Sequence, residues 1–181
     1  MERVTLPDEH RPVLAPIQTF LAERGCESWL VGGYVRDLLR GRPSGDIDIA
    51  VAGSALTLAR ELADRTGGAF VPLHDATDTA RIVWTSELAA PTVIDLVRLR
   101  APSIEEDLRL RDLTINALAL PLQEGLAAID LRGLLLDPTQ GESDLRRRQI
   151  RPCGPNALSD DPLRMLRAAR FAAQFGFALA S

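Results

Sequence analysis

The sequence predicts an α+β fold, in which a mixed sheet flanked by helices is followed by a closing helix. The first observation is a set of short segments, rich in Val and Ile, whose residues alternate between apolar and polar as in strands. The second is that segments with apolar residues three and four positions apart, as in helices, lie between them. The third is that 46% of the 181 residues are hydrophobic, which is enough for the core of one domain.

The elements are expected in the following order. Strands are predicted where β-branched residues cluster, at 28–31, 46–51, 69–73, 80–85 and 92–99. Helices are predicted between capping residues and stop glycines, at 11–25, 34–40, 54–64, 142–148 and 162–176, with a charged helical turn at 105–111. A hairpin is predicted from two apolar runs separated by Gln123-Glu124-Gly125, at 115–120 and 126–131.

Composition narrows the class of protein. No apolar run approaches the length that crosses a membrane, and the N-terminus lacks the hydrophobic region of a signal peptide. Cys26 and Cys153 have no metal or redox spacing, so a reduced, cytoplasmic compartment is the simplest expectation. The net charge of −4 divides into −9 for residues 1–144 and +5 for residues 145–181, and every basic residue is Arg. This division fits metal chemistry beside an anion-binding surface, although a solvated basic helix would have the same composition.

Two aspartates, one residue apart, form the first candidate site. Asp46 and Asp48 lie in an alternating strand pattern, so their carboxylates share one face of the sheet. Neighbouring carboxylates repel each other, and a divalent cation holding phosphate oxygens is the usual reason for such a pair. The alternative is a plain surface feature, which also produces Asp-x-Asp on strands.

A glycine pair precedes these aspartates. Gly32 and Gly33 end a strand and lead into a helix that carries Arg36, an arrangement that lets the backbone and a guanidinium approach phosphate oxygens. A tight strand-to-helix turn, with Arg36 paired to Asp37 or to solvent, would explain the same residues. The glycines, the arginine and the two aspartates in close succession favour phosphoryl transfer.

Two later segments can complete a nucleotide site. In the first, Arg111 would bind a triphosphate while Asp112 and Asn116 hold the nucleotide or support the loop; the alternative is a salt-bridged turn. The second segment is the last predicted helix, which carries a row of arginines at 164, 167 and 170, with Asp161 one turn before Arg164. Asp161 and Arg164 would offer an acceptor and a donor to the edge of a base, whereas the alternative is an ordinary amphipathic helix with internal ion pairs.

Together, these segments resemble the head and neck of class II tRNA nucleotidyltransferases and bacterial poly(A) polymerases, which are template-independent enzymes of the polymerase-beta superfamily. The resemblance runs from Trp29 to Phe177. It implies a polymerase-beta-like nucleotidyltransferase head, with a mostly antiparallel sheet, over residues 1–151. Residues 152–181 would then be the start of a helical neck.

The resemblance also implies roles for individual residues. Asp46 and Asp48 would bind two Mg²⁺ ions, and Asp95 would be a third carboxylate on the strand at 92–99. Asp161 and Arg164 would select the incoming base. The residues expected to contact the nucleotide are Gly32, Gly33, Arg36, Arg111, Asp112, Asn116, Asp161, Arg164, Arg167 and Arg170.

The sequence departs from the family pattern at three places. Leu110 precedes Arg111-Asp112 where the family has a second arginine, and Asp160 replaces a glutamate before Asp161. The connection from Arg100 to Glu105 is short, whereas CCA-adding members usually have a longer flexible loop there. A shortened loop resembles the CC-adding subclass.

The predicted activity is therefore the addition of CMP and/or AMP to the 3′ end of tRNA, from CTP and/or ATP, by two-metal phosphoryl transfer. A poly(A) polymerase acting on other RNAs, and a nucleotide- or RNA-binding fragment with little activity of its own, remain alternatives. A signalling nucleotidyltransferase is disfavoured by the arginine-rich last helix. The apolar side of that helix, which includes Leu163, Leu166, Ala169 and Phe171, is expected to pack on a part of a longer protein beyond the head.

Overall fold

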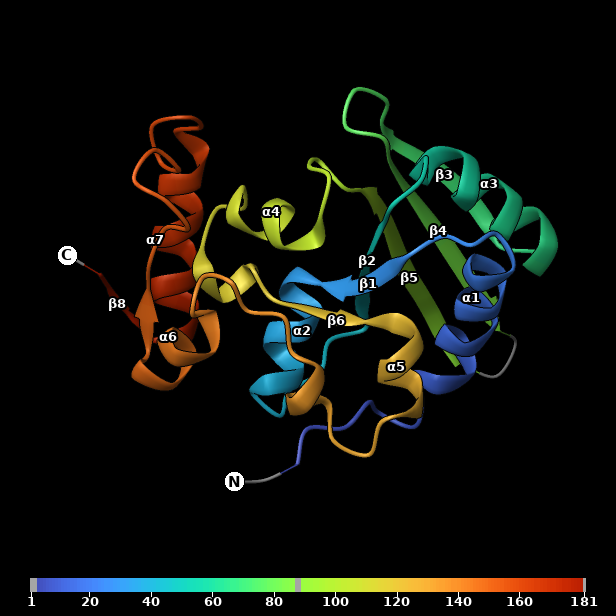
Figure 1. Cartoon of the computed structure of the whole chain (residues 1–181), viewed down its shortest axis with the longest axis horizontal. Coiled ribbons are helices and arrows are strands. Elements are labelled where there is room, and N and C mark those ends of the chain that lie inside the picture. Colours follow the sequence, from blue (N-terminus) through green and yellow to red (C-terminus); the bar gives the residue numbers. More distant parts are fainter. Residues whose placement is uncertain (1–2, 87–88, 181) are drawn as a thin grey trace.

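A six-stranded sheet organises the protein (Figure 1). The computed structural model describes residues 3–86 and 89–180. Along the sheet, the strand order is β3-β4-β5-β2-β1-β6, and β2 and β5 form its one parallel pair within the described residues. The strands are β1 (Ser28–Val31), β2 (Asp46–Val51), β3 (Ala69–His74), β4 (Thr79–Ser86), β5 (Ala89–Arg98) and β6 (Ala119–Pro121). The predicted α+β class with a mostly antiparallel sheet is confirmed.

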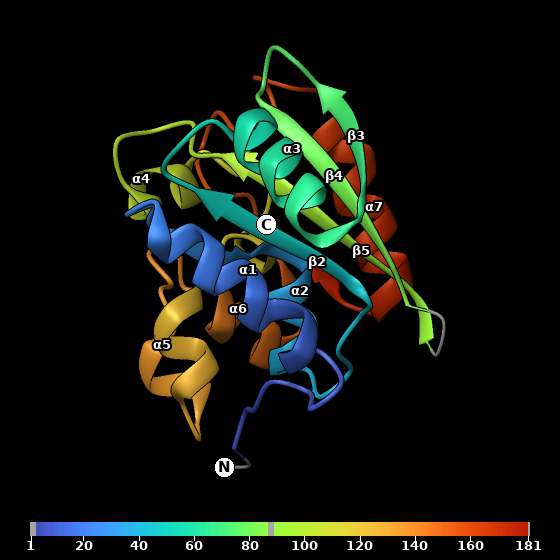
Figure 2. The same cartoon turned by 90° about the vertical axis from the view of Figure 1, so that its right-hand side faces the viewer.

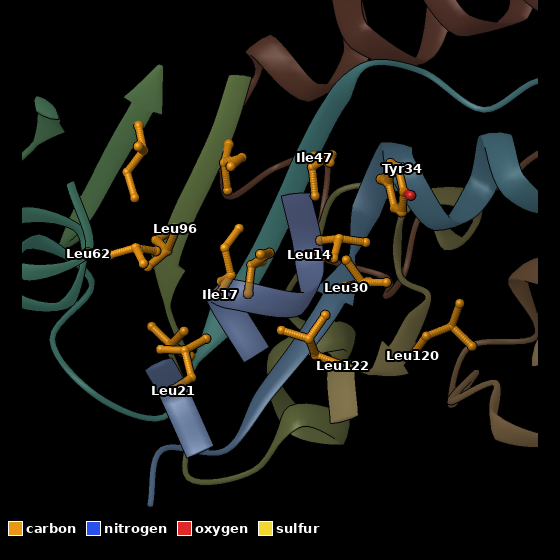
Figure 3. Packing of buried hydrophobic residues seen from close by; sticks show 14 of the residues in the cluster. Leu14, Ile17, Leu21, Leu30, Tyr34, Ile47, Leu62, Leu96, Leu120 and Leu122 are labelled. Atoms are coloured by element: carbon orange, nitrogen blue, oxygen red, sulfur yellow. The ribbon is translucent and has the colours of Figure 1, made fainter. Parts of the chain in front are cut away.

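One face of the sheet is covered by helices α1 (Arg11–Glu23), α3 (Ala55–Thr66) and α5 (Leu122–Ala127) (Figure 2). Because side chains alternate along β2, Ile47 and Ile49 point into this layer while Asp46 and Asp48 point away from it. Figure 3 shows buried hydrophobic side chains packed together between the sheet and the helices. Its largest members include Leu14, Ile17, Leu21, Leu30, Ile47, Leu62 and Leu96.

The other face carries the acidic residues and is only partly covered. Helix α4 (Ile104–Arg109) packs Ile104 and Leu108 against Val31 and Ala50 at one end of this face. Helix α2 (Gly32–Leu39) begins directly after β1, and the 3₁₀ turns η1 (Thr114–Asn116) and η2 (Leu131–Leu134) flank β6. The end of β2 that bears Asp46 and Asp48 is thereby left open.

The C-terminal segment closes the open side. It consists of α6 (Gly141–Arg147), β7 (Gln149–Ile150), α7 (Leu163–Phe175) and β8 (Ala178–Leu179), with β7 and β8 paired in parallel. The exposure of the apolar side of α7 changes along the helix. Phe171 is buried against Leu113 and Ile115 of the head, whereas Leu163 and Leu166 remain 65% and 69% exposed. The expectation that this side would find its partner only beyond the head is therefore wrong for Phe171.

Two element predictions are corrected. The hairpin predicted at 115–120 and 126–131 does not form; instead η1, β6 and α5 follow one another. The physical reason is that β6 pairs with β1, placing Leu120 opposite Leu30, and Leu122 then continues into the core as the first residue of a helix. Helix α2 begins at Gly32, two residues earlier than predicted. No helix in the described ranges is long and apolar enough to cross a membrane.

Candidate active site

An open cavity of about 840 Å³ lies between the uncovered end of the sheet and α7. It is a size that suits a nucleotide-sized ligand. The cavity gathers residues that are far apart in the sequence, and all but one of the predicted site residues line it. Those residues are Gly32, Gly33, Arg36, Asp46, Asp48, Arg111, Asp112, Asn116, Asp161, Arg164, Arg167 and Arg170.

The acidic wall of the cavity comes from β2 and its parallel neighbour. Asp46 is exposed, Asp48 is half-buried, and the register places Asp48 directly opposite Asp95 of β5. Burial, reinforced by the charges of Asp95 and Asp46, raises the pKa of Asp48 to about 6 despite the nearby guanidinium of Arg111. The ionised form of Asp48 is therefore disfavoured in the folded protein, and a bound cation would offset that cost.

Asp95 differs from the other two carboxylates because it already has a cation. Arg81 of β4 lies opposite Asp95 in the antiparallel register and donates to both of its carboxylate oxygens, Nε to Oδ1 at 2.7 Å and Nη2 to Oδ2 at 2.9 Å. Asp95 is the one predicted site residue that does not line the cavity. Its predicted role as third carboxylate thus depends on a pair with Arg81 that the sequence does not reveal.

The donor set fits a hard divalent cation that is shared with a ligand. Within the described ranges, no three Asp, Glu, His or Cys side chains are grouped so that they could hold a metal ion by themselves. Mg²⁺ is commonly bound by one or two carboxylates, with substrate phosphates and water completing its shell. Asp46 and Asp48, which both line the cavity, provide that incomplete set.

Gly32 allows the acidic and basic walls to approach each other. Its φ of +68° lies in the left-handed region, and a Cβ there would lie 3.3 Å from both Asp48 Oδ2 and Arg111 Nη1. The amide of Gly32 donates to the carbonyl of Leu118 at 3.1 Å, so this N–H is not free for a phosphate. Gly32 therefore acts through its lack of a side chain rather than through its amide.

Arg36 is largely enclosed. It donates to both carboxylate oxygens of Asp37 and, through Nη1 at 2.7 Å, to Oδ1 of Asn116. Its guanidinium carbon also lies 5.0 and 4.9 Å from the ring centroids of Phe171 and Phe175. The pairing with Asp37, which was the structural alternative for this arginine, is present. Arg36 nevertheless lines the cavity, and its predicted contact with the nucleotide stays a prediction.

Arg111 is held in place by a carboxylate that sequence reasoning did not single out as a site residue. Asp107 of α4 is only 2% exposed, and its Oδ2 accepts bonds from Arg111 Nε at 3.2 Å and Nη2 at 3.0 Å. Its Oδ1 accepts from the backbone and side chain of Arg100, both at 3.0 Å. Burial opposes ionisation, but the two arginines leave the pKa of Asp107 below its usual value. Asp107 thus orients two guanidiniums at the cavity wall.

Asp112 connects the head to α7. Its Oδ2 accepts from Arg167 Nε at 2.7 Å, and its Oδ1 accepts from the backbone of Leu113 and the side chain of Asn116. Burial alone would raise the pKa of Asp112, but the bond from Arg167 and the other donors lower it. Asp112 and Asn116 therefore link segments around the cavity, and their predicted contact with the nucleotide stays a prediction.

The turn η1, which carries Asn116, is held in place by contacts with α6. Thr114 donates to the buried Asp144 at 2.5 Å, and Arg151 donates to the same oxygen at 3.0 Å. Gly141 is required at the start of α6, because a Cβ there would lie 2.0 Å from the carbonyl oxygen of Thr114. These contacts help to position Asn116, whose Oδ1 accepts the bond from Arg36.

Helix α7 supplies the remaining wall. Arg164 lies 3.8 Å from Asp161 and donates to the carbonyls of Ala157 at 3.2 Å and Leu110 at 3.4 Å. These backbone bonds anchor the guanidinium at the cavity, and Asp161 accepts a bond from the amide of Leu163 at 3.0 Å. Arg170 lies over the ring of Phe171, 4.8 Å from its centroid. The predicted acceptor therefore lies just before α7, beside the predicted donor in the first turn of that helix.

Comparisons with known proteins show the family to which the chain belongs. A fold with clustered strand carboxylates and an arginine-lined cavity defines a nucleotidyltransferase head. Residues 28–151 match the family described as the Poly A polymerase head domain, and the chain belongs to that family.

Two relatives and one solved structure illustrate the similarity. The chain is 43% identical to a CC-adding tRNA nucleotidyltransferase of Geobacter sulfurreducens, over 91% of this chain and 37% of that protein. It is 44% identical to an A-adding tRNA nucleotidyltransferase of Deinococcus radiodurans, over 83% of this chain and 31% of that protein. A CCA-adding enzyme in complex with ATP matches with a TM-score of 0.82 and 33% identity, over 97% of this chain and 41% of that one. The chain thus spans between about a third and two fifths of these relatives.

Proposed function

We propose that this chain is the catalytic head and the start of the neck of a tRNA nucleotidyltransferase, which adds CMP and/or AMP to the 3′ end of tRNA in the cytoplasm. The observation that carries the proposal is the cavity in which Asp46 and Asp48 face arginines from three separate segments. The names of its relatives support tRNA as the acceptor and CTP and/or ATP as donors. The head would comprise residues 1–151 and the neck would begin at residue 152.

Asp46 and Asp48 would hold the metal, which we propose to be Mg²⁺. Asp95, which lies opposite Asp48 on β5, would be the third carboxylate. When bound, Mg²⁺ lowers the pKa of a coordinated hydroxyl and neutralises charge on phosphate oxygens. In the reaction, the 3′-oxygen of the RNA forms a bond to the α-phosphorus of the nucleotide. The bond between that phosphorus and the bridging oxygen breaks, pyrophosphate leaves with the electron pair, and the hydroxyl proton is released to solvent.

The arginines of the cavity have separate tasks in this proposal. Arg111, oriented by Asp107, would bind the triphosphate and stabilise the charge that develops on the leaving pyrophosphate. Asp161 and Arg164 would pair with the edge of the incoming base. A wrong base would leave a donor or acceptor unpaired in the cavity, which is how such a site discriminates.

We further propose CC addition as the specific reaction. Support comes from the short connection between β5 and α4, which runs from Leu99 to Ser103, and from the similarity to a CC-adding enzyme. The similarity to an A-adding enzyme makes A addition the competing specificity. Poly(A) addition to other RNAs, and nucleotide binding with little activity of this chain alone, are the other candidates.

The test is incubation of the chain with tRNA lacking its 3′ end and each nucleoside triphosphate separately, followed by sequencing of the ends. CTP alone should extend the RNA by two residues if the enzyme is CC-adding. Asp46→Ala should abolish incorporation, whereas Asp64→Ala, which removes an exposed carboxylate on α3, should not change it. Incorporation retained by Asp46→Ala would disprove the metal assignment. Binding of CTP without incorporation by the unaltered chain would favour the binding fragment.

A further inference from the structure

A second cavity, of about 420 Å³, lies beside the candidate active site. Gln174 of α7 lines the first cavity and its neighbour Phe175 lines the second, so the two adjoin across this helix. Figure 1 shows α2, α6 and α7 gathered on this side of the molecule. The charged lining of the second cavity comprises five arginines and one glutamate: Arg40, Arg42, Arg132, Arg146, Arg148 and Glu142.

The positive charge of this cavity is only partly neutralised. Arg132 and Arg146 share Glu142, at 2.5 and 3.8 Å, and Arg40 pairs with Asp37 of the same helix at 3.2 Å. Within residues 3–86 and 89–180, neither Arg42 nor Arg148 forms an ion pair. Guanidiniums gathered without matching carboxylates repel one another, and an anion that binds among them relieves this repulsion.

The backbone holds the unpaired arginines at the cavity. Arg148 ends α6 in the left-handed region, with φ of 55°, and its carbonyl accepts a bond from Ala178 of β8 at 2.9 Å. The amide of Arg42 donates to the carbonyl of Asp37 at 2.9 Å, which ties the turn after α2 to the helix. Both side chains are thus carried by fixed backbone rather than by a free loop.

Phe175 links the two cavities physically. The guanidinium carbon of Arg36, which lines the first cavity, lies 4.9 Å from its ring centroid, and that of Arg40, which lines the second, lies 4.0 Å from it. A nucleic-acid strand whose end occupies the first cavity would therefore pass close to the second cavity, because Gln174 and Phe175, which line one each, are consecutive residues of α7. A single inorganic phosphate would leave most of a 420 Å³ hollow unfilled, whereas a sugar–phosphate chain would fill it.

We propose that the second cavity binds phosphodiester groups of the RNA whose 3′ end enters the active site. The inference rests on the proposed function for the identity of the polymer, but the binding itself requires no catalysis. Guanidiniums match phosphate oxygens in planar, two-point contacts, and they bind the backbone without regard to base sequence. Of the arginines in residues 145–181, Arg146 and Arg148 line this cavity, whereas Arg164, Arg167 and Arg170 line the candidate active site.

The test is fluorescence anisotropy of a labelled RNA hairpin with a single-stranded 3′ end, titrated with the 181-residue chain over a series of salt concentrations. Arg42→Ala and Arg148→Ala should each weaken binding about fivefold at 0.1 M salt and reduce the slope of log K against log salt by about 0.7. The double variant should lose about 25-fold. Arg147→Ala is the matched control, because it removes an equal charge from α6 at a residue that does not line the cavity. It should change the slope little.

The outcomes separate this inference from the proposed function. Equal RNA affinity of Arg42→Ala and Arg147→Ala would overturn the docking site, and so would the absence of RNA binding by the unaltered chain. A loss of affinity for CTP or pyrophosphate, measured by calorimetry, without a loss for RNA would assign the cavity to a free phosphate compound instead. Failure of nucleotide incorporation, with the expected RNA results, would disprove only the proposed reaction.

Discussion

Replacement of Asp48 by Asn is expected to stabilise the metal-free protein at pH 8 and to abolish nucleotide transfer. The pKa of Asp48 is raised from 3.8 to about 6, by burial first and then by Asp95 and Asp46. At 1.36 kcal/mol for each pKa unit, this difference corresponds to about 3 kcal/mol of unfavourable free energy for the ionised carboxylate in the folded state. Asparagine keeps the shape of the side chain and removes its charge, so most of that cost disappears.

The sign of the pH dependence follows from which state binds the proton more tightly. Because the folded-state pKa of Asp48 lies above the unfolded one, the ionised form destabilises the fold at pH values above about 6. The cost falls as the pH decreases from 6 to 3.8, since the carboxyl group becomes protonated in the folded state. The advantage of Asp48→Asn should therefore be largest at pH 8 and vanish near pH 4.

The assay is urea unfolding of both proteins in the presence of EDTA, at pH 8 and pH 5. A gain of about 1 to 3 kcal/mol at pH 8 is expected, equivalent to a rise in Tm of about 2 to 4 °C for each kcal/mol. Asp64→Asn, on the exposed side of α3, should stay within about 0.5 kcal/mol of the unaltered protein. A variant of Asp48 that is less stable than the unaltered protein at pH 8 would refute the reasoning, because attraction to Arg111 would then outweigh burial and repulsion.

Three further substitutions test other parts of the structure. Asp107→Ala should lower the free energy of unfolding in urea by about 3 to 5 kcal/mol, because it leaves Arg100 and Arg111 without their buried partner. It should also weaken CTP binding, and an unchanged CTP affinity would contradict the positioning role of Asp107. Arg164→Ala should shift the ratio of CTP to ATP incorporation more than it slows total transfer, and an unchanged ratio would argue against base selection by α7. Leu62→Ala should cost about 2 to 5 kcal/mol by opening a cavity in the core, and a loss below 1 kcal/mol would show that α3 is loosely packed.

The sequence predicted the parts of the fold that depend on local pattern. The strands at Ser28–Val31 and Asp46–Val51 have the bounds expected from alternation, and Ser54 caps α3 through a bond from the amide of Thr57. The hairpin prediction failed because Leu122 packs in a core that includes residues of α1 and β1, which are distant in sequence, and a local pattern does not contain those partners. Gln123-Glu124-Gly125, which looked like a turn, lies inside helix α5.

The candidate site was predictable in its residues but not in its pairings. Motif spacing gave Asp46, Asp48 and Arg164, which all line the cavity. The bond between Arg81 and Asp95 depends on the register of β4 against β5, which no spacing rule supplies. A partial signal existed, since Arg81 lies in a strand pattern beside apolar residues, where a charge needs a partner.

The parallel pairing of β2 with β5 also constrains when the site can form during synthesis. Asp48 and Asp95 lie opposite each other, yet the chain between them forms α3, β3 and β4. Contacts between distant residues require loop closure before they contribute, so they form late. On the ribosome, the two carboxylates can meet only after β5 has emerged, and α7 follows about sixty residues later. A nascent chain therefore completes the pairing of β2 with β5 before α7 is available to close the cavity.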